Sequence, residues 1–466
     1  MKKRGLVWFK NDLRVHDNEA LVTAQKECAE LVLCYCIEES WFERHYLGFR
    51  RADINRFRFL EQSVLQLRDN LEAIGGHLLI GEKSAVETLP ELVEEHGITD
   101  IYAEGEYAPY ELELVEKVCS KLPEVDFHFF WGKTLYHIDD IPFEISKIPL
   151  TSKAYRIPVG RQTQVRDVFD VPKKLNGVKD VKSSSFPDCK VYGFTRKEYK
   201  DSRPLVDGGE DAALERLEYY TFKSELLTKY RWSRNGSKGM DYSSKLSPWL
   251  ALGCISVREI YFKVKEYEEK IKKNQSTWWL VFELVWRDYF TFKGMRMGVP
   301  MFLTKGFKNR KVEWENDPKK FDRWCDGTTG IPFVDAHMRQ LNATGFMSNR
   351  GRVNCSSYLV HDLKIDLTWG AAYFESKLID YDVSSNWMNW HMQAFEIWYT
   401  NPVHQSNKYK AQDFIREWVP ELSKLDDVEV LIPWEFEAKK YVKPIEVYPK
   451  WSRAINLIKK IAEPKK

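Results

Sequence analysis

Short apolar runs alternate with longer amphipathic segments over the first 130 residues of the chain. Residues 54–70 are an example of the longer kind, with apolar side chains at Phe57, Leu60, Val64 and Leu67, which is the spacing of a helix with one buried face. Strands that alternate with helices indicate a parallel sheet covered by helices on both faces. The runs expected to be strands are RGLVWF (4–9), ELVLCYCI (30–37), HLLIG (77–81), DIYA (100–103) and DFHFF (126–130).

The pattern changes twice beyond residue 130. Residues 131–207 are rich in Pro, Ser, Lys and Gly and lose their periodicity, which predicts a partly ordered linker on the surface. Residues 208–466 have a helical pattern with many aromatic positions. We therefore expect an α/β domain over residues 1–130, joined by the linker to an all-α domain. In the first domain, Asp17 precedes the first helical pattern and is a candidate N-cap.

Composition narrows the class of protein. A chain of 466 residues is long enough for two or three domains, and its net charge of +2 does not indicate a nucleic-acid binder, although a local basic groove remains compatible with it. No apolar run has the length of a membrane span, and charge interrupts the apolar stretch after Phe9, which predicts a cytoplasmic protein without a targeting signal. Tryptophan is unusually frequent: 14 of the 17 lie from Trp232 onward.

Several common kinds of site are not indicated. The eight cysteines form no CxxC pair and are expected to be free, buried thiols, and the ten histidines lack metal-binding spacing. The segment after Phe9 lacks the glycines that approach a dinucleotide pyrophosphate. A nicotinamide-dependent enzyme and a metalloenzyme are therefore disfavoured.

Five segments, in this order, resemble the photolyase/cryptochrome family. Three sequence motifs are most similar to those of the cryptochrome DASH subgroup: YSSKLSPWLALG, TGFMSNRGR and DYD-x-x-SNW-x-NW. The resemblance implies an antenna domain followed by a helical domain that binds FAD, which agrees with the pattern above. The segments are VWFKNDLRVHDNEAL (7–21), DYSSKLSPWLALGCIS (241–256), FELVWRDYF (282–290), GTTGIPFVDAHMRQLNATGFMSNRGR (327–352) and LIDYDVSSNWMNW (378–390).

The resemblance implies a set of FAD-binding residues. Serine hydroxyls around Lys245 precede an apolar helical segment, an arrangement that can bind a diphosphate or can equally be a plain helix cap. Asp380 would need a partner if buried, and Arg352 is the expected one. Asn386 is implied to face the central nitrogen of the flavin, and Arg339 to lie near the cofactor. The implied set is Tyr230, Ser243, Ser244, Lys245, Leu246, Ser247, Glu283, Arg287, Asn349, Arg352, Asp380, Asp382 and Asn386.

A substrate cavity is expected along the helical segment 279–290. Trp279, Glu283 and Trp286 share one face of that helix, and a carboxylate among tryptophans is costly unless it is paired or protonated. The structural alternative is a surface ion pair between Glu283 and Arg287. The family resemblance implies instead that Glu283 donates a proton or hydrogen bond to a DNA lesion on which Trp286 stacks. Arg287 and Arg350 are candidates for DNA phosphates.

Two positions bear on which lesion is bound. Ser348 and Asn349 stand where the (6-4) photolyases have a catalytic histidine pair, which favours a cyclobutane pyrimidine dimer. Met392 stands where a dimer photolyase has an aromatic residue, so one face of the stacking sandwich is missing, at a cost of about 1–3 kcal/mol. The catalytic set implied by resemblance is Glu283, Trp286, Asn349, Asn386 and Met392. Loss of the stacking partner agrees with a preference for single-stranded DNA, with RNA as an alternative strand.

The family reduces its flavin through three tryptophans, and one of them is missing here. Trp390 and Trp314 match the proximal and distal positions, whereas the middle position is Leu367, which cannot be oxidised. Trp369, Trp324 and Tyr373 are candidates for a detour. We expect photoreduction to be rerouted or slow. The alternative is that most of the tryptophans are simply core residues.

The subgroup also implies an antenna and leaves other functions open. A 5,10-methenyltetrahydrofolate antenna is expected between the domains, with Glu106 as the matching acidic residue. The favoured function is an FAD-dependent, light-driven deoxyribodipyrimidine photo-lyase, acting as a monomer away from membranes. The alternatives are a blue-light photoreceptor and a single-stranded nucleic-acid binder with vestigial chemistry.

Overall fold

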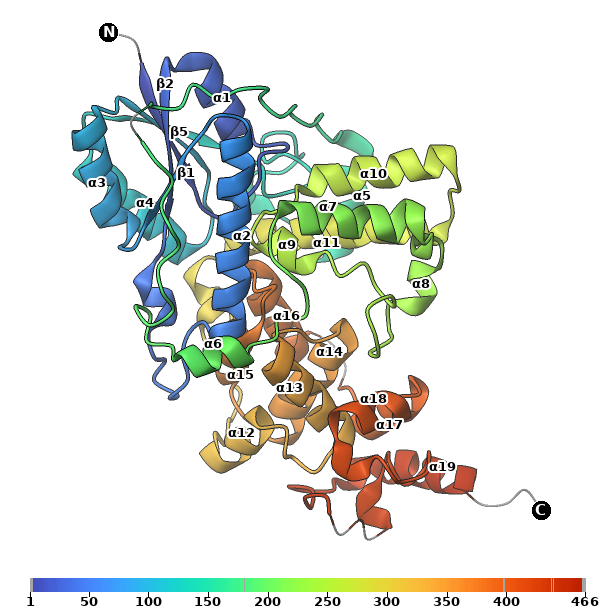
Figure 1. Cartoon of the computed structure of the whole chain (residues 1–466). Helices are drawn as coiled ribbons and strands as arrows, with labels where there is room; N and C mark the ends of the chain where they lie inside the picture. The colour runs from blue at the N-terminus through green and yellow to red at the C-terminus, as the bar shows by residue number, and fades with distance from the viewer. Residues whose placement is uncertain (1–2, 180, 397–398, 437, 439, 463–466) are drawn as a thin grey trace.

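A five-stranded parallel sheet forms the amino-terminal part of the molecule (Figure 1). The structure, a computed structural model, describes residues 3–179, 181–396, 399–436, 438 and 440–462. Neighbouring strands are parallel throughout, in the order β3-β2-β1-β4-β5. The strands are β1 (Arg4–Phe9), β2 (Glu30–Cys36), β3 (Leu78–Gly81), β4 (Asp100–Glu104) and β5 (Asp126–Phe130). Each of them matches a run that the sequence predicts, although β4 extends one residue beyond its run, to Glu104.

Side chains that alternate along the strands are buried on opposite faces of the sheet. Val7 and Phe9 of β1 pack with α1 and α2 on one face, while Leu6 and Trp8 pack with α3 and α4 on the other. Both faces are therefore covered, which explains why the strands are apolar at nearly every position and confirms the predicted α/β class. The four helices are α1 (Glu19–Glu27), α2 (Ile54–Ala73), α3 (Ala85–His96) and α4 (Pro109–Lys121).

The first helix is capped by a different residue from the one predicted. Asn18, not Asp17, is the N-cap of α1, and its side chain accepts a hydrogen bond from the backbone N–H of Leu21 at 3.0 Å. Asp17 has a left-handed backbone with φ of 49°, and its carboxylate is bonded by Arg258, 241 residues away. The prediction of Asp17 was wrong because a distant partner takes its carboxylate.

The segment between the sheet and the helices is more ordered than the sequence suggests. It contains α5 (Ser152–Gln162) and α6 (Arg196–Asp201) between long irregular stretches. Pro158 and Gly160 lie inside α5 and disguise it as a loop, since both residues disfavour helix interiors. The Thr195 and Glu198 side chains form a capping box on α6, a signal that was present in the sequence and was missed.

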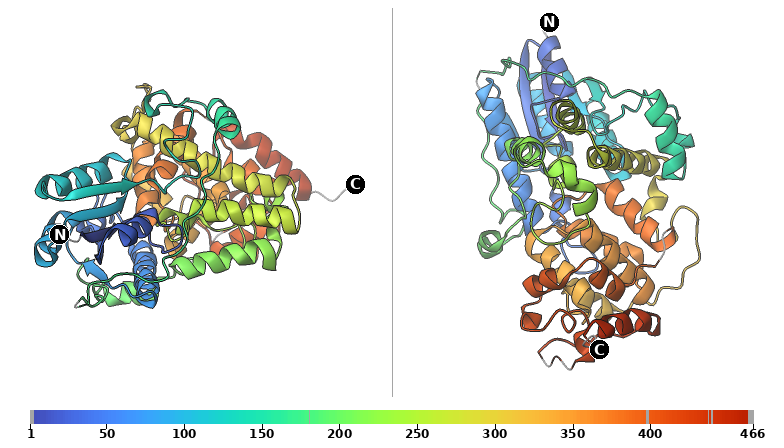
Figure 2. Two further views of the ribbon diagram at one scale, coloured as in Figure 1. Left: turned by 90° about the horizontal axis from the view of Figure 1, so that it is seen from above. Right: turned by 90° about the vertical axis from the view of Figure 1, so that its right-hand side faces the viewer.

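From α7 onward the described chain is built of helices without regular strands, as predicted (Figure 2). The longest of them, α11, begins at the N-cap Asn274 and runs beside α10. The helices are α7 (Glu210–Glu218), α8 (Tyr230–Ser233), α9 (Ser247–Ala251), α10 (Val257–Lys270), α11 (Gln275–Met297), α12 (Pro318–Cys325), α13 (Pro332–Thr344), α14 (Asn349–Ser357), α15 (Leu367–Lys377), α16 (Val383–Phe395), α17 (Pro402–Lys408), α18 (Gln412–Trp418) and α19 (Ser452–Ala462).

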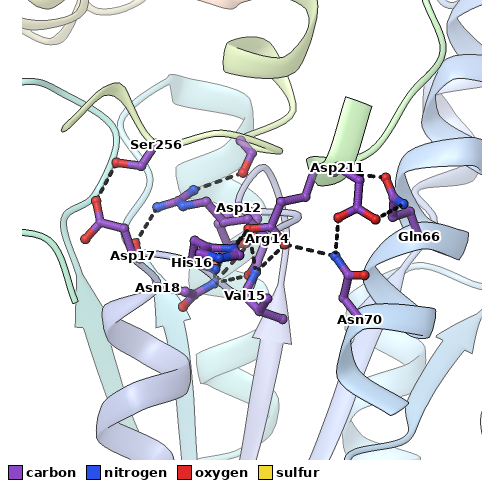
Figure 3. Close-up of polar contacts among 12 residues, drawn as sticks. Asp12, Arg14, Val15, His16, Asp17, Asn18, Gln66, Asn70, Asp211 and Ser256 are labelled. Carbon is purple, nitrogen blue, oxygen red and sulfur yellow. Dashed lines mark hydrogen bonds and ion pairs between the residues drawn. The ribbon is translucent and has the colours of Figure 1, made fainter. Parts of the chain in front are cut away.

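A buried polar network joins the sheet to these helices (Figure 3). Arg258 of α10 bonds Asp17 with an Nη2–Oδ1 distance of 2.7 Å, and their side chains are 5% and 0% exposed. At the start of α7, Glu210 accepts hydrogen bonds from the backbone N–H groups of Val15 and His16. Val15, His16 and Asp17 lie in the loop that connects β1 to α1, so the network fixes the helical part against the carboxyl end of the sheet.

The eight cysteines are free, as expected, and seven of them are buried. Cys34 and Cys36 lie on the same face of β2 with their sulfur atoms 3.6 Å apart. Cys119 on α4 is the half-buried exception.

Candidate cofactor and substrate site

A cavity of about 1220 Å³ lies between the sheet part and the helical part of the molecule. Three of the residues singled out in the sequence line it: Glu106 after β4, Arg287 on α11 and Asp382 at the start of α16. The hydroxyl of Tyr107 donates a hydrogen bond to Asp382 at 3.1 Å across the cavity wall, although 275 residues separate them. The other residues of the predicted FAD set lie outside this lining.

The Asp241–Ser247 segment forms a compact, basic turn. Arg216 donates hydrogen bonds to the backbone carbonyls of Ser243 and Ser244 at 3.1 and 2.9 Å. Lys245 has a left-handed backbone with φ of 61°, and its ammonium lies 3.1 Å from the Ser243 hydroxyl and 3.0 Å from the ring centre of Tyr242. The turn therefore gathers two cations and two serines in one place, with Leu246 buried behind them.

Lys245 is buried without a carboxylate beside it. Only 3% of the residue is exposed, and no acidic side chain lies within ion-pair distance in the described part of the chain. Burial, together with the nearby cations Arg216 and Arg352, lowers the pKa of Lys245 to about 6. A bound phosphate would supply the missing charge, so this turn fits the diphosphate of FAD.

The ion pair predicted between Arg352 and Asp380 is present. The Nη2 atom of Arg352 lies 2.9 and 2.7 Å from the two carboxylate oxygens of Asp380, which is buried. Asp380 also accepts a hydrogen bond from the hydroxyl of Ser247 at 2.7 Å. The pair therefore connects the basic turn to α14 and α16.

Helix α16 presents Asn386 and Trp390 on one buried face. Asp382 is its N-cap and accepts from the backbone N–H of Ser385, while the amide of Asn386 donates to the carbonyl of Ala371 on α15 at 3.0 Å. That bond fixes the orientation of the Asn386 side chain. Met392, two residues beyond Trp390, is half-buried against the helical core.

On α11, Glu283 has a partner other than the one considered in the sequence. The Nη1 atom of Arg234 lies 2.5 Å from Glu283 Oε1, and the indole N–H of Trp279 donates to the same oxygen at 2.9 Å. The ion pair with Arg287 is not formed, because the Arg287 guanidinium donates to the backbone carbonyl of Lys133 instead. The Glu283 side chain is 32% exposed, so its carboxylate lies at an open surface, beside the half-buried Trp286.

The remaining predicted residues are dispersed around this face. Asn349 is exposed at the first turn of α14, while Arg350 donates to the side chain of Asn235 at 2.7 Å. Arg339 pairs with Glu421 at 2.9 Å, a contact with the carboxyl-terminal helices that draws it away from the basic turn. Tyr230 is buried at the start of α8. Arg350 thus lies beside the segment that contains Arg234 and Asn235. Arg339 instead contacts Glu421.

The aromatic residues proposed for electron transfer form a connected group. The Trp390 and Trp324 ring centres are 6.2 Å apart, and Trp324 is fully buried. The ring of Phe321 separates Trp324 from Trp369, at 5.8 and 5.2 Å respectively. Trp314 is half-buried against the same core. Of the detour candidates, Trp324 is thus the one that contacts Trp390 directly.

Glu106 lies in a buried cluster of alternating charges. Its carboxylate is 3.3 Å from the ammonium of Lys10 and 3.2 Å from that of Lys133, which also pairs with Glu104 at 2.9 Å. Burial opposes the charge on Glu106, but the two lysines outweigh it and hold the pKa of the carboxyl below its usual value. Next to this cluster, burial raises the pKa of Glu111 to about 7.

Two family models match the chain on either side of its middle. The model for DNA photolyase matches residues 5–165, and the model for the FAD binding domain of DNA photolyase matches residues 279–460. A relative from Xenopus laevis named cryptochrome DASH is 38% identical, over 96% of this chain and 90% of its own. The chain belongs to the cryptochrome DASH group of the photolyase/cryptochrome family.

Solved structures of the family agree with this assignment. A cryptochrome from Synechocystis is 36% identical and superposes with a TM-score of 0.90, covering 99% of both chains. An archaeal photolyase from Sulfolobus tokodaii is 25% identical with a TM-score of 0.78, covering 98% of this chain and 99% of its own, and its structure contains two FAD molecules. FAD binding and the photolyase fold are thus properties of the family to which this chain belongs.

Four residues of the site were missed by reasoning on the sequence. They are Arg216, Arg234, Tyr107 and Lys133, and each acts through a contact with a residue at least 25 positions away. For Lys133, the signal available was its position directly after β5, because the carboxyl ends of parallel strands gather binding residues. The two arginines lie in irregular or short helical segments and gave no such signal.

Two other kinds of feature, a metal-binding cluster and a membrane span, are absent from the described residues. Within these ranges, acidic, histidine and cysteine side chains form no cluster that could hold a metal ion. The helices that the structure describes include none with the length and apolar character of a membrane span.

Proposed function

We propose that this chain is a light-driven lyase that splits cyclobutane pyrimidine dimers, with single-stranded DNA as its preferred substrate. The observation that carries the proposal is the Glu283 carboxylate, held by Arg234 and Trp279 on an open aromatic face of α11 beside Trp286. Family membership supplies the FAD-binding fold on which the reaction depends. A histidine is absent at Ser348 and Asn349, which favours this dimer over the (6-4) lesion.

The cofactor would be held by the basic turn and α16. Lys245 and the serines around it would bind the diphosphate, Arg352 and Asp380 would fix the adjacent wall, and Asn386 would face the flavin ring. The chemistry expected of reduced FAD in this site is light-driven donation of one electron to the dimer, with return of the electron once the ring has opened. Arg287, Asp382 and Tyr230 are proposed as further contacts.

The protein's own task is to bind and orient the dimer. Glu283 would donate a hydrogen bond to a pyrimidine carbonyl as the protonated acid, so binding of the lesion would have to break its ion pair with Arg234. Trp286 would stack on one face of the dimer. On the other face, Met392 has no aromatic ring with which to stack. Asn349 and Arg350, which lie at the first turn of α14, would contact the flanking nucleotides, and Arg287 is the second candidate for a phosphate contact.

The test is light-dependent loss of dimers from an oligonucleotide, single-stranded and duplex, with the reduced protein. We expect repair of the single strand to be lost in Glu283→Ala and largely kept in Arg196→Gln, an exposed arginine elsewhere on the surface. If the wild-type protein with bound, reduced FAD repairs neither strand, the proposal fails and a blue-light photoreceptor becomes the leading function. Affinity for undamaged strands without repair would instead favour a vestigial nucleic-acid binder.

We also propose that, under light, electrons from an external reductant in solution reach the flavin through Trp324 and then Trp390, since Leu367 interrupts the usual route. The 6.2 Å separation of the two ring centres supports this route, with Trp369, Tyr373 and Trp314 as the residues through which electrons would enter from the solvent side. Trp324→Phe should slow photoreduction severely, and Trp369→Phe should slow it less. Equal rates in wild type and Trp324→Phe would contradict the route. The accumulation of reduced flavin can be followed by absorbance under blue light.

A 5,10-methenyltetrahydrofolate antenna in the interdomain cavity is proposed as a second chromophore. The cavity is large enough for a ligand of that size, and the carboxylates on its wall include Glu104, Glu106 and Glu111. Because both lysine contacts of Glu106 are already made, a pterin would have to replace one of them. The molecule is further proposed to act as a cytoplasmic monomer, with RNA as an alternative strand.

A further inference from the structure

The solvent side of α11 carries a row of aromatic rings that continues beyond the proposed lesion site. Trp278, Phe282 and Trp286 follow one another at helical spacing of four, with ring centres 4.9 and 6.3 Å apart. Trp278 is 51% exposed, although large aromatic side chains are usually buried. The repair chemistry proposed above uses Trp286 and leaves Trp278 and Phe282 without a role.

Guanidinium groups from two other helices lie over rings of this row and over rings beside it. Arg156 of α5 lies 4.3 Å from the ring centre of Phe282 and 5.7 Å from that of Trp286. Arg231 of α8 lies 4.8 Å from the ring centre of Trp232, which is 74% exposed, and 5.3 Å from that of Trp279, whose ring centre is 5.6 Å from that of Trp278. The Nε atom of Arg156 is buried and has no hydrogen-bond partner in the described part of the molecule. We call Trp232, Trp278 and Phe282, with Arg156 and Arg231, the aromatic strip.

The combination of aromatic rings and arginines in the strip indicates the kind of partner that it binds. Exposed rings bind the faces of nucleobases whatever their sequence, and adjacent arginines bind the phosphates between them. An unpaired strand offers both features together, whereas the bases of a duplex are stacked on each other and closed to the rings. Glu283, the acidic residue at the end of the strip, is already neutralised by Arg234.

We propose that the aromatic strip binds the undamaged nucleotides of single-stranded DNA that flank the lesion. The inference rests on the proposed function, because the lesion site at Trp286 fixes where the strand enters the strip. From there the strand would pass along Phe282 and Trp278 toward Trp232. It also gives that function a physical basis for its strand preference. Binding along the strip compensates for the aromatic ring that Met392 does not provide.

The test is binding of a fluorescent, undamaged dT16 strand to the FAD-loaded protein in the dark. Trp278→Ala should weaken binding about tenfold, as expected for the loss of one stacked base. Arg156→Gln should weaken it less and should lower the dependence of log Kd on log salt by about 0.7. Phe436→Ala and Arg196→Gln, an exposed aromatic residue and an exposed arginine outside the strip, should leave the affinity unchanged.

The outcomes separate this inference from the proposed function. Repair of an isolated dinucleotide dimer by the wild-type protein tests the function alone, because so short a substrate cannot reach Trp278. If that dimer is repaired while both strip variants bind dT16 as tightly as wild type, the strip is overturned and the function stands. If repair is absent but the variants lose affinity for dT16, the strip stands without the function. The flavin absorbance spectrum of each variant checks that it is folded.

Discussion

Two buried lysines of this molecule have opposite surroundings. Lys245, in the basic turn before α9, lies among serines, arginines and a tyrosine ring, and burial lowers its pKa to about 6. Lys133, after β5, is buried to a similar extent, with 8% of its side chain exposed, but it lies between Glu104 and Glu106. Burial disfavours its charge too, yet the two carboxylates raise the pKa of Lys133 above its usual value.

The difference shows what each lysine contributes to the protein. The cluster around Lys133 contains its own counter-charges and is complete without a ligand, so its charges stabilise the contact between the sheet and the cavity wall. The turn around Lys245 contains no counter-charge of its own, which is the basis for proposing it as the site of the FAD diphosphate. Burial alone therefore does not indicate a ligand site, whereas burial of a charge without its counter-charge gives a candidate for one.

The largest effect is expected on breaking the complete cluster. Lys133→Met leaves the buried Glu104 without its ion-pair partner, and we expect the free energy of unfolding to fall by about 3–5 kcal/mol. Urea denaturation measures this change. The double variant Lys133→Met/Glu104→Gln removes the stranded charge and should recover a substantial part of the loss. A single variant as stable as wild type would contradict the description of the cluster.

In the turn around Lys245, substitution of the lysine should weaken the binding of FAD. Lys245→Met removes a charge-assisted contact to the diphosphate and should weaken FAD binding by about 1.5–3 kcal/mol, roughly 10- to 100-fold in Kd. Titration of the apoprotein with FAD, followed by flavin fluorescence, measures the change. The ligand-free variant should unfold no more easily than ligand-free wild type, because it loses only a buried amine that has no ion-pair partner. Destabilisation comparable to that of Lys133→Met would remove the distinction between the two sites.

The smallest effect concerns pH. Between pH 6 and 10.5 the unfolded chain keeps a proton on Lys245 that the folded apoprotein loses, so Lys245 makes the free energy of unfolding rise with pH. The rise is at most about 1.4 kcal/mol per pH unit. We expect Lys245→Met to flatten this slope between pH 6.5 and 8.5, and saturating FAD to suppress it. The stabilisation from Lys133 has the opposite dependence, since it is complete below pH 10.5 and is lost only as pH rises through its folded pKa. Identical slopes for wild type and Lys245→Met would contradict the lowered pKa.

Much of the fold was predictable because local pattern determined it. The three central strands, β1, β2 and β4, are buried at nearly every position, and their apolar runs are therefore almost continuous in sequence. α5 was missed because Pro158 and Gly160 oppose the helix locally, and packing against α11 overrides that preference. The cap of α1 was misplaced by one residue for a similar reason, since Arg258 claims the Asp17 carboxylate.

The sequence predicted which residues belong to the candidate site better than it predicted which of them contact each other. Arg352 and Asp380, 28 residues apart, were matched through family resemblance. For Glu283, helical spacing offered Arg287 as the structural alternative, yet its partner in the structure is Arg234, from the end of α8. Periodicity gives the neighbours on one helix only, so the partner of a half-exposed carboxylate depends on tertiary structure.

The ion pair between Asp17 and Arg258 has a consequence for how the sequence can change in evolution. Each residue is buried, and each sits in a different half of the molecule. A substitution at either one leaves the other as a solitary charge in the interior, so the two positions are expected to covary among relatives. Recombinants that join the first half of one homologue to the second half of another should remain viable where both parents carry this pair, and should fail where only one parent does.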